Sequence, residues 1–216
     1  MHFISLGRHC ATSYNIRKYI DSNIETQFFD WLRTDFKCVL EVLNVKNINE
    51  IFNIENIIVD KELYKDDNNL SITLKNFVKN NSTLLFHHDI LLSEYIEQET
   101  NQKLIEFIDK YKRRYDRLIE LIKTNKKLYF IYFITENFDY NDTNIFNILV
   151  LKINKNINYV LILMKEEKQG SCYIYNIYNN YIEINITNFV LDSYTDDWTL
   201  NKYDWKKMFE LIQQTF

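Results

Sequence analysis

The chain of 216 residues contains no proline and only two glycines, Gly7 and Gly170. Asparagine is abundant, and we expect it to supply the left-handed turn positions that glycine usually takes. No linker rich in Pro, Gly or Ser, no repeat and no long charge block divides the sequence. We therefore expect one domain over residues 1–216, which is long enough to bury a core without disulfides or metals.

Cysteine is also scarce, and Cys10, Cys38 and Cys172 are widely spaced. An odd number of cysteines at such spacings gives no disulfide framework and suits a reducing compartment. No apolar run approaches the roughly 20 residues that span a bilayer. The N-terminus lacks the basic region, the long apolar stretch and the cleavage site of a secretory signal. We expect a cytoplasmic protein with no membrane contact.

The chain has no excess of positive charge, since its net charge is −4 and its pI about 5.6. This balance excludes the electrostatic footprint of a duplex nucleic-acid binder at the level of the whole chain. Neither a P-loop nor a GxGxxG motif is present, so nothing predicts a nucleotide cofactor. Hydrophobic residues at 46% and charged residues at 26% are ordinary for a globular protein.

Strand-like and helix-like segments alternate along the chain. Strands are expected at 3–6, 57–59, 72–74, 84–87, 127–134, 159–164, 172–178 and 181–186, and helices at 11–20, 35–44, 102–124, 142–153 and 204–214. Several strands are almost wholly apolar, which indicates a sheet covered on both faces. We predict a three-layer α/β fold with a mainly parallel sheet between helix layers, and with the hairpin of 172–186 at an edge.

The segment SLGRHC at residues 5–10 is the first candidate for a functional site. Cys10 follows a strand and precedes a helix, and active residues of open α/β sheets gather at the carboxyl ends of strands. The positive end of the helix dipole would lower the pKa of the thiol and favour the thiolate. Gly7 indicates a backbone with positive φ or a close approach by a ligand. The alternative is an inert, buried cysteine.

Histidine occurs at only two places in the chain. The four residues are His2, His9, His87 and His88. If the strands of 3–6 and 84–87 are neighbours in one sheet, Cys10 and a histidine meet at the same sheet end. The pairing of these two strands is thus the premise on which a thiol–imidazole pair depends.

Only one of His87 and His88 can face Cys10, because successive strand residues point to opposite faces. We favour His88, which lies further past the apolar run and beside Asp89. A thiol, an imidazole and a carboxylate that orients the ring form an activated nucleophile. Alternatively, the strand end is a hydrogen-bonded terminus without chemistry.

A zinc site is a weaker alternative. Good zinc ligands gather in these two segments: His9, Cys10, His87, His88 and Asp89. No CxxC or HxxxH spacing supports such a site, so we expect no metal.

Asp30 lies in the aromatic segment QFFDWL at residues 27–32 and should not be buried without a partner. The partner is either a backbone N–H at the start of the following helix or the histidine of the site. Trp31, next to it, is a candidate substrate contact.

The helix of 102–124 carries a basic group on its surface: Lys110, Lys112, Arg113, Arg114 and Arg117. Glu106 and Asp109 stand four residues before Lys110 and Arg113, which predicts a solvated, ion-paired face. An arginine that turns inward could bind a substrate carboxylate or phosphate with two hydrogen bonds. Arg114 is our candidate for this role.

Taken together, these motifs resemble a domain-of-unknown-function family that is named after papain-like cysteine peptidases and has bacterial and large-DNA-virus members. The similarity rests on SLG-x-x-C at 5–10, FDW at 29–31, HD at 88–89, KYKRRYDRLIELI at 110–122, KLYFIYF at 127–133 and DDWTLNKYDW at 196–205. It thus extends over nearly the whole chain.

The resemblance implies that Cys10 is the nucleophile and His88 the general base, with Asp30 or Asp89 as the group that orients the imidazole. The family often has asparagine where this chain has His9, so the resemblance does not carry over an oxyanion-hole role to this position. His9 is our candidate substrate contact there. A papain-like α+β core is the implied alternative fold. If the chain is viral, its compartment would be the host cytoplasm.

Two classes of function follow. The first is a thiol-dependent hydrolase that acts through a thioester on a peptide, amide or ester, or an acyl-transferase with the same Cys–His pair. The second is a non-catalytic binding module in which Cys10 only packs.

Overall fold

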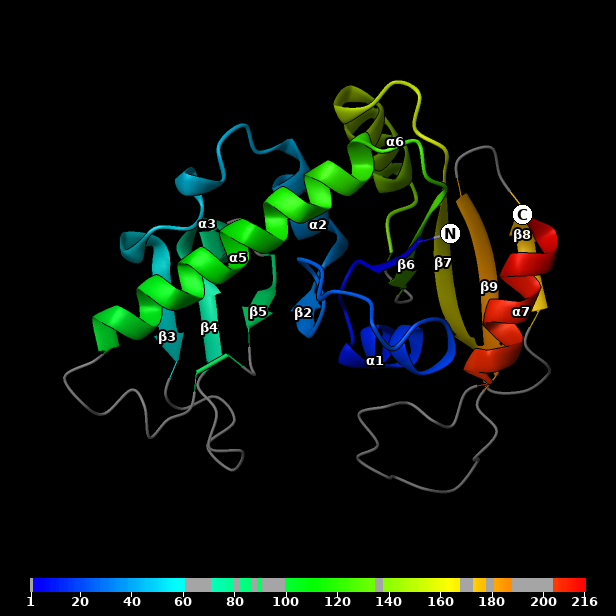
Figure 1. The fold of residues 1–216 in the computed structure, drawn as a ribbon, viewed down its shortest axis with the longest axis horizontal. Helices are drawn as coiled ribbons and strands as arrows, with labels where there is room; N and C mark the ends of the chain where they lie inside the picture. Colours follow the sequence, from blue (N-terminus) through cyan, green and yellow to red (C-terminus); the bar gives the residue numbers. More distant parts are fainter. Residues whose placement is uncertain are drawn as a thin grey trace.

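A computed structural model describes the chain at residues 2–60, 71–79, 82–86, 89–90, 100–134, 138–167, 173–177, 181–187 and 204–216. Within these ranges the strands form two sheets, which lie side by side in Figure 1. No helix in the described ranges is both long and apolar enough to cross a membrane.

The larger sheet has the strand order β1-β6-β7-β9-β8. Its strands are β1 (His2–Ser5), β6 (Leu128–Phe133), β7 (Tyr159–Glu167), β8 (Tyr173–Ile177) and β9 (Tyr181–Thr187). The first four strands in the spatial order are parallel, and β8 pairs antiparallel with β9 at the edge. The α/β class, the mainly parallel sheet and the edge hairpin are therefore confirmed.

The smaller sheet has the order β2-β5-β4-β3 and is antiparallel throughout. Its strands are β2 (Leu32–Thr34), β3 (Ile57–Asp60), β4 (Ser71–Leu74) and β5 (Leu84–Phe86). The premise that the strands of 3–6 and 84–87 are neighbours in one sheet is wrong, because β1 and β5 belong to different sheets. Strand β2, which has only three residues, was not predicted.

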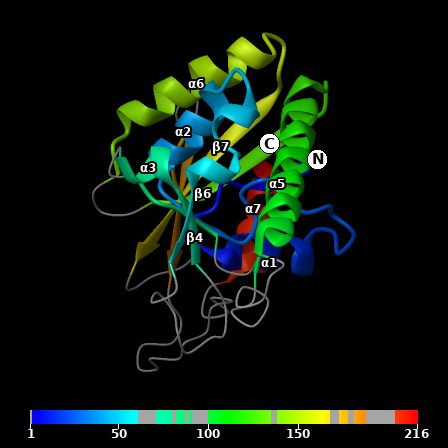
Figure 2. The ribbon, with the colours of Figure 1, turned by 90° about the vertical axis from the view of Figure 1, so that its left-hand side faces the viewer.

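The described residues form helices α1 (Cys10–Tyr19), α2 (Phe36–Asn44), α3 (Lys75–Lys79), α5 (Thr100–Lys123), α6 (Asn141–Ile153) and α7 (Trp205–Thr215), with the short 3₁₀ helices η1 (Ile48–Glu50) and η2 (Ile54–Asn56). Some of them cover both faces of the parallel sheet. Figure 2 shows α2 and α6 on one side of β7 and α1 and α7 on the other.

Alternate strand residues enter two different hydrophobic clusters. Ile4 and Phe130 pack in the cluster that includes residues of α2, α5 and α6. Their neighbours Phe3 and Tyr129 pack in the cluster that includes residues of α1 and α7. Because successive strand residues point to opposite faces, this alternation confirms the three layers.

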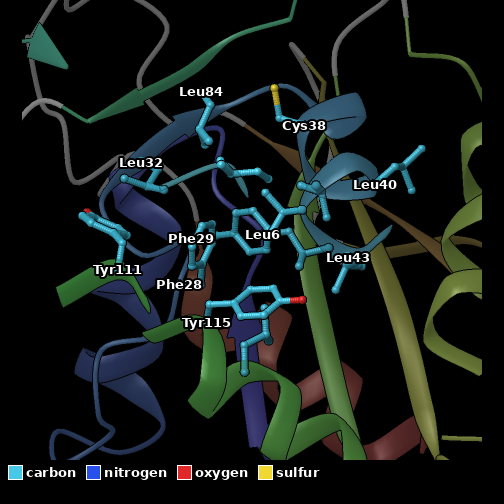
Figure 3. Packing of buried hydrophobic residues seen from close by; sticks show 14 of the residues in the cluster. Leu6, Phe28, Phe29, Leu32, Cys38, Leu40, Leu43, Leu84, Tyr111 and Tyr115 are labelled. Atoms are coloured by element: carbon cyan, nitrogen blue, oxygen red, sulfur yellow. The ribbon is translucent and has the colours of Figure 1, made fainter. Parts of the chain in front are cut away.

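One of these clusters extends across both sheets. It contains Leu6 from the end of β1, Leu32 and Phe86 from the smaller sheet, and Tyr111 from α5. Figure 3 shows Leu6, Leu32 and Tyr111 around Phe28 and Phe29 in this shared core. The two sheets thus share one hydrophobic core within the described residues.

The turn after β1 brings the edges of the two sheets together. Gly7 and Arg8 have left-handed φ values of 86° and 70°. A Cβ atom on Gly7 would lie 2.6 Å from Thr34 Oγ1 and 2.8 Å from Thr34 Cβ, so only glycine leaves room for β2 here. The positive φ expected for Gly7 is confirmed, and the group that approaches it closely is Thr34 of β2 rather than a ligand.

We expect Gly7→Ala to lower the free energy of unfolding by about 2 kcal/mol or more. A left-handed φ costs a residue with a Cβ atom about 1–2 kcal/mol, and the new methyl group also meets Thr34. Urea denaturation measures the change. Lys37→Ala on the exposed side of α2 is the control and should change the value by about 0.5 kcal/mol or less. Equal stability of both variants would contradict the role assigned to Gly7.

Candidate active site

Cys10 is the first residue of α1 and stands at the carboxyl end of β1, the edge strand of the parallel sheet. The side chain of His9, the residue before the helix, makes no capping hydrogen bond. In the first turn of α1, the N–H of Thr12 donates to the backbone carbonyl of His9 at 3.3 Å. The carboxyl end of a parallel strand is where α/β proteins place reactive groups.

The turn before Cys10 is fastened to the smaller sheet by Asp35. Arg8 Nη1 lies 3.2 Å from Asp35 Oδ1. Asp35 Oδ2 accepts a hydrogen bond of 2.9 Å from the backbone N–H of Thr83, just before β5. Asp35 N in turn donates to Thr83 O at 2.9 Å. One aspartate thus joins the turn at Arg8, the start of α2 and the start of β5.

Burial raises the pKa of the Cys10 thiol above its usual value. The backbone N–H at the helix start lowers it, and the negative charge of Asp30 raises it further. The helix start acts on the thiol in the direction expected of the helix dipole, but desolvation of the half-buried thiol has the larger effect on its pKa.

Asp30 is 3% exposed and accepts three hydrogen bonds, each 2.8 Å long. Ser13 Oγ donates to its Oδ1, while Arg17 Nη2 and the backbone N–H of Gln27 donate to its Oδ2. Ser13 and Arg17 belong to α1. The carboxylate therefore fastens the helix that begins at Cys10 to the turn before β2.

As one alternative, the sequence suggested that Asp30 accepts a hydrogen bond from a backbone N–H at the start of the following helix. The partners in the structure are different. The bonded N–H belongs to Gln27, which precedes Asp30, and α2 begins only at Phe36. Asp30 is therefore not a cap of the following helix. Ser13 and Arg17 were missed, although their i,i+4 spacing on the helix predicted for 11–20 puts both on one face and offered a signal.

His9 and Trp31, the candidate substrate contacts, both border α1. His9 is exposed, and its ring meets the ring of Phe133 edge-on at 5.5 Å. Trp31 is half-buried with a φ of 67°, and the Arg17 guanidinium lies 5.6 Å from its ring centre. Both side chains thus lie near the helix that carries Cys10.

Asp89 is held by α5. Lys110 Nζ pairs with Asp89 Oδ1, and Tyr111 OH donates to Asp89 Oδ2 at 2.7 Å. Burial and the charge of Asp89 raise the pKa of the Tyr111 phenol, so it remains a donor. Arg114 lies over the same ring, with its guanidinium carbon 4.9 Å from the centre. Asp89 and Arg114 thus belong to one cluster around Tyr111.

The basic face of α5 is only partly solvated. Lys110 pairs with Asp89 rather than with Glu106, and Arg117 Nε lies 3.4 Å from Glu25 Oε2 in the loop after α1. The pair of Glu106 with Lys110 that the spacing predicts is replaced by the pair of Lys110 with Asp89, while Arg117, for which the spacing predicts no partner, reaches the loop after α1.

His87 and His88 lie outside the described residues, so the Cys10–His88 pair stays a prediction. The residues on both sides of the pair are described. Phe86 at the end of β5 is the Cα partner of Leu32, two residues after Asp30. Asp89 is fixed to α5.

No three His, Cys, Asp or Glu side chains within the described ranges come together to hold a metal ion. The zinc alternative depended on the two histidines outside those ranges. A cavity of about 430 Å³ lies elsewhere, between the end of α2, α5 and the end of α6. Its lining includes Leu43, Tyr115 and Ile153, and none of the predicted site residues.

Comparisons with known proteins agree with the motifs. The family model described as "Putative papain-like cysteine peptidase (DUF1796)" matches residues 1–167. An uncharacterized protein of Acanthamoeba polyphaga mimivirus is 24% identical over 226 aligned positions, which cover 95% of this chain and 96% of the relative. No solved structure matches the chain.

We expect Tyr111→Phe to lower the free energy of unfolding by about 1.5–3 kcal/mol, because the change removes a buried hydrogen bond to a charged acceptor. Tyr115→Phe is the matched control on the same helix. Its hydroxyl donates at 3.2 Å to the neutral Val45 carbonyl, so the loss should be about 0.5–1.5 kcal/mol. Urea denaturation of both variants checks the order, and a reversed order would show that Asp89 does not depend on Tyr111.

Proposed function

The chain belongs to the family described as "Putative papain-like cysteine peptidase (DUF1796)", and we propose on this basis that Cys10 is the nucleophile of a thiol-dependent hydrolase. The Cys10 sulfur bonds to the carbonyl carbon of a peptide, amide or ester. The base takes the thiol proton and gives it to the leaving group. Water then hydrolyses the thioester and releases the carboxylic acid.

The observation that carries the proposal is the place of Cys10 at the start of α1 and the carboxyl end of β1. The N–H groups in the first turn of a helix point toward its N-terminal end. At Cys10 and Ala11 such groups would stabilise the negative oxygen of a tetrahedral intermediate.

The raised pKa of Cys10 makes a base necessary, and we propose His88 for this role. Support comes from the strand that precedes it. Strand β5 ends at Phe86, beside Leu32, and Asp30 two residues before Leu32 contacts Ser13 in the first turns of α1. The chain thus leaves β5 close to the helix of the nucleophile. An imidazolium beside the sulfur would offset the desolvation of the thiolate.

We propose Asp89 rather than Asp30 as the group that orients the imidazole. A carboxylate has about four lone-pair sites. Asp30 accepts three hydrogen bonds from described residues and Asp89 accepts two, so Asp89 retains more capacity for an imidazole N–H. Asp89 is also adjacent to His88 in the sequence.

His9 and Trp31 are the proposed substrate contacts, because both border the helix of Cys10. Arg114 would contribute a charge for a substrate carboxylate only where the substrate extends to α5, since it lies over Tyr111 there. An acyl-transferase would use the same nucleophile and base, with an amine or alcohol in place of water.

One observation favours a second candidate, a non-catalytic binding module. A thiol with a raised pKa is a poor nucleophile and packs well against apolar neighbours. The two candidates differ in the ionisation of Cys10, which chemical labelling measures.

We expect iodoacetamide to alkylate Cys10 of the native protein at neutral pH, because a nearby imidazolium stabilises the thiolate. In His88→Ala the burial of the thiol and the charge of Asp30 remain, and both raise its pKa. The alkylation rate at pH 7 should therefore fall by about tenfold for each unit by which the pKa rises. Peptide mapping by mass spectrometry identifies the label on Cys10.

His87→Ala is the matched control, because neighbouring strand residues point to opposite faces and only one histidine can serve Cys10. It should leave the pH profile of alkylation unchanged. Slow alkylation of the native protein until strongly alkaline pH, without an effect of His88→Ala, would exclude the hydrolase and support the binding module. Peptide substrates are then screened against native protein and Cys10→Ala, with the acyl group on Cys10 as the expected intermediate.

A further inference from the structure

A single buried carboxylate holds α1 at two points along its length. Asp30 bonds to Ser13 and Arg17, which follow Cys10 by three and seven residues. At about 3.6 residues per turn these positions lie one and two turns beyond the nucleophile, on nearly the same side of the helix. Two bonds to one fixed group restrict the rotation of the helix about its axis, and with it the direction of the Cys10 side chain.

The turn that carries Asp30 is held by a hydrogen bond and by aromatic packing. Asp30 sits in a turn in which its own N–H donates to Gln27 O at 3.3 Å. Phe28 and Phe29 in this turn are 0% exposed, and the Phe28 ring meets the Tyr111 ring edge-on at 5.8 Å. The carboxylate is therefore anchored in the aromatic core before it contacts α1.

The Arg17 side chain contacts three residues that precede β2. Its guanidinium pairs with Asp30 at 2.8 Å and lies 5.6 Å from the ring centre of Trp31, in the same turn. Nη2 also donates to Thr26 Oγ1 at 3.2 Å. A half-buried arginine with these three partners has little rotamer freedom, so it transmits the position of the turn to the helix.

We propose that Asp30 is a positioning residue for Cys10: it fixes the orientation of α1 through Ser13 and Arg17, and it does not orient the histidine. This inference rests on the proposed function, in which Cys10 is the nucleophile. It assigns separate roles to the two carboxylates: Asp30 positions the helix of the nucleophile, and Asp89 orients the imidazole of the base.

Asp30 could position α1 or orient the imidazole, and these two roles predict opposite changes in the pH profile of Cys10 alkylation. The negative charge of Asp30 disfavours the Cys10 thiolate, so Asp30→Asn should move the onset of alkylation to lower pH. An aspartate that orients the imidazole would do the reverse, because its loss weakens the imidazolium and the onset moves to higher pH.

The test compares two reagents on Cys10. Acylation by p-nitrophenyl acetate transfers an acetyl group to the sulfur, releases p-nitrophenolate and needs the oxyanion to meet the start of α1. Alkylation by iodoacetamide needs no such alignment and reports only the available thiolate. In Asp30→Asn we expect acylation to fall about tenfold relative to alkylation at equal thiolate fraction, with the lower pH onset described above.

Ser13→Ala keeps the proposal falsifiable if Asp30→Asn does not fold. It removes one contact with Asp30 and should lower the same ratio by about threefold, with the pH onset unchanged. The double variant should be no worse than Asp30→Asn alone, because Ser13 acts through Asp30. The control is Glu25→Gln, an exposed acid in the preceding loop that pairs with Arg117 and should leave the ratio unchanged.

An onset moved to higher pH in Asp30→Asn, or additive losses in the double variant, would overturn the proposal. So would an unchanged acylation-to-alkylation ratio in a folded Ser13→Ala protein. If the proposed function fails, the alkylation rate of Cys10 does not respond to His88→Ala. Even then, the ratio of acylation to alkylation at a pH above the thiol pKa measures the alignment of Cys10.

Discussion

The close approach of Gly7 and Thr34 is the constraint on which the rest of the structure depends. A Cβ atom at Gly7 would come within 2.6 Å of Thr34 Oγ1, so β2 can approach the end of β1 only because that atom is missing. The edges of two separate sheets meet at this point, and α1 begins just beyond it. Arg8 and Asp35 reinforce the junction with an ion pair, but they can do so only where the backbones already lie together.

Buried charges around this junction are paired with donors from the helices. Asp30 takes its donors mainly from α1, and Asp89 takes both of its donors from α5. Because an unpaired buried carboxylate would be strongly destabilising, each pairing fixes the position of a loop relative to a helix. Phe28 and Tyr111 are in ring contact between the two carboxylates, so the aromatic core joins the two anchors.

The sequence predicted the parts of the fold that repeat along the chain. Continuous apolar strands separated by amphipathic helices identified the parallel sheet, and the stripe on α5 identified the longest helix. Strand β2 carries no such pattern, because three residues in an aromatic segment form a strand only through pairing with β5. The partners of Asp30 and the pKa of Cys10 depend on distances and burial in the folded chain. The i,i+4 spacing of Ser13 and Arg17 indicates that they share one helix face, but it does not identify Asp30 as their partner.

The pKa of Cys10 changes what its position at a helix start means. The helix dipole alone argues for a free thiolate, but burial opposes it and Asp30 adds a like charge. The residue that holds α1 in place thus disfavours the charged form of the group that α1 carries. The contact that fixes the orientation of the thiol therefore also raises the pKa of the thiol. A nucleophile of this kind ionises when its proton passes to a neighbouring imidazole, since the resulting ion pair needs less solvation than an isolated thiolate.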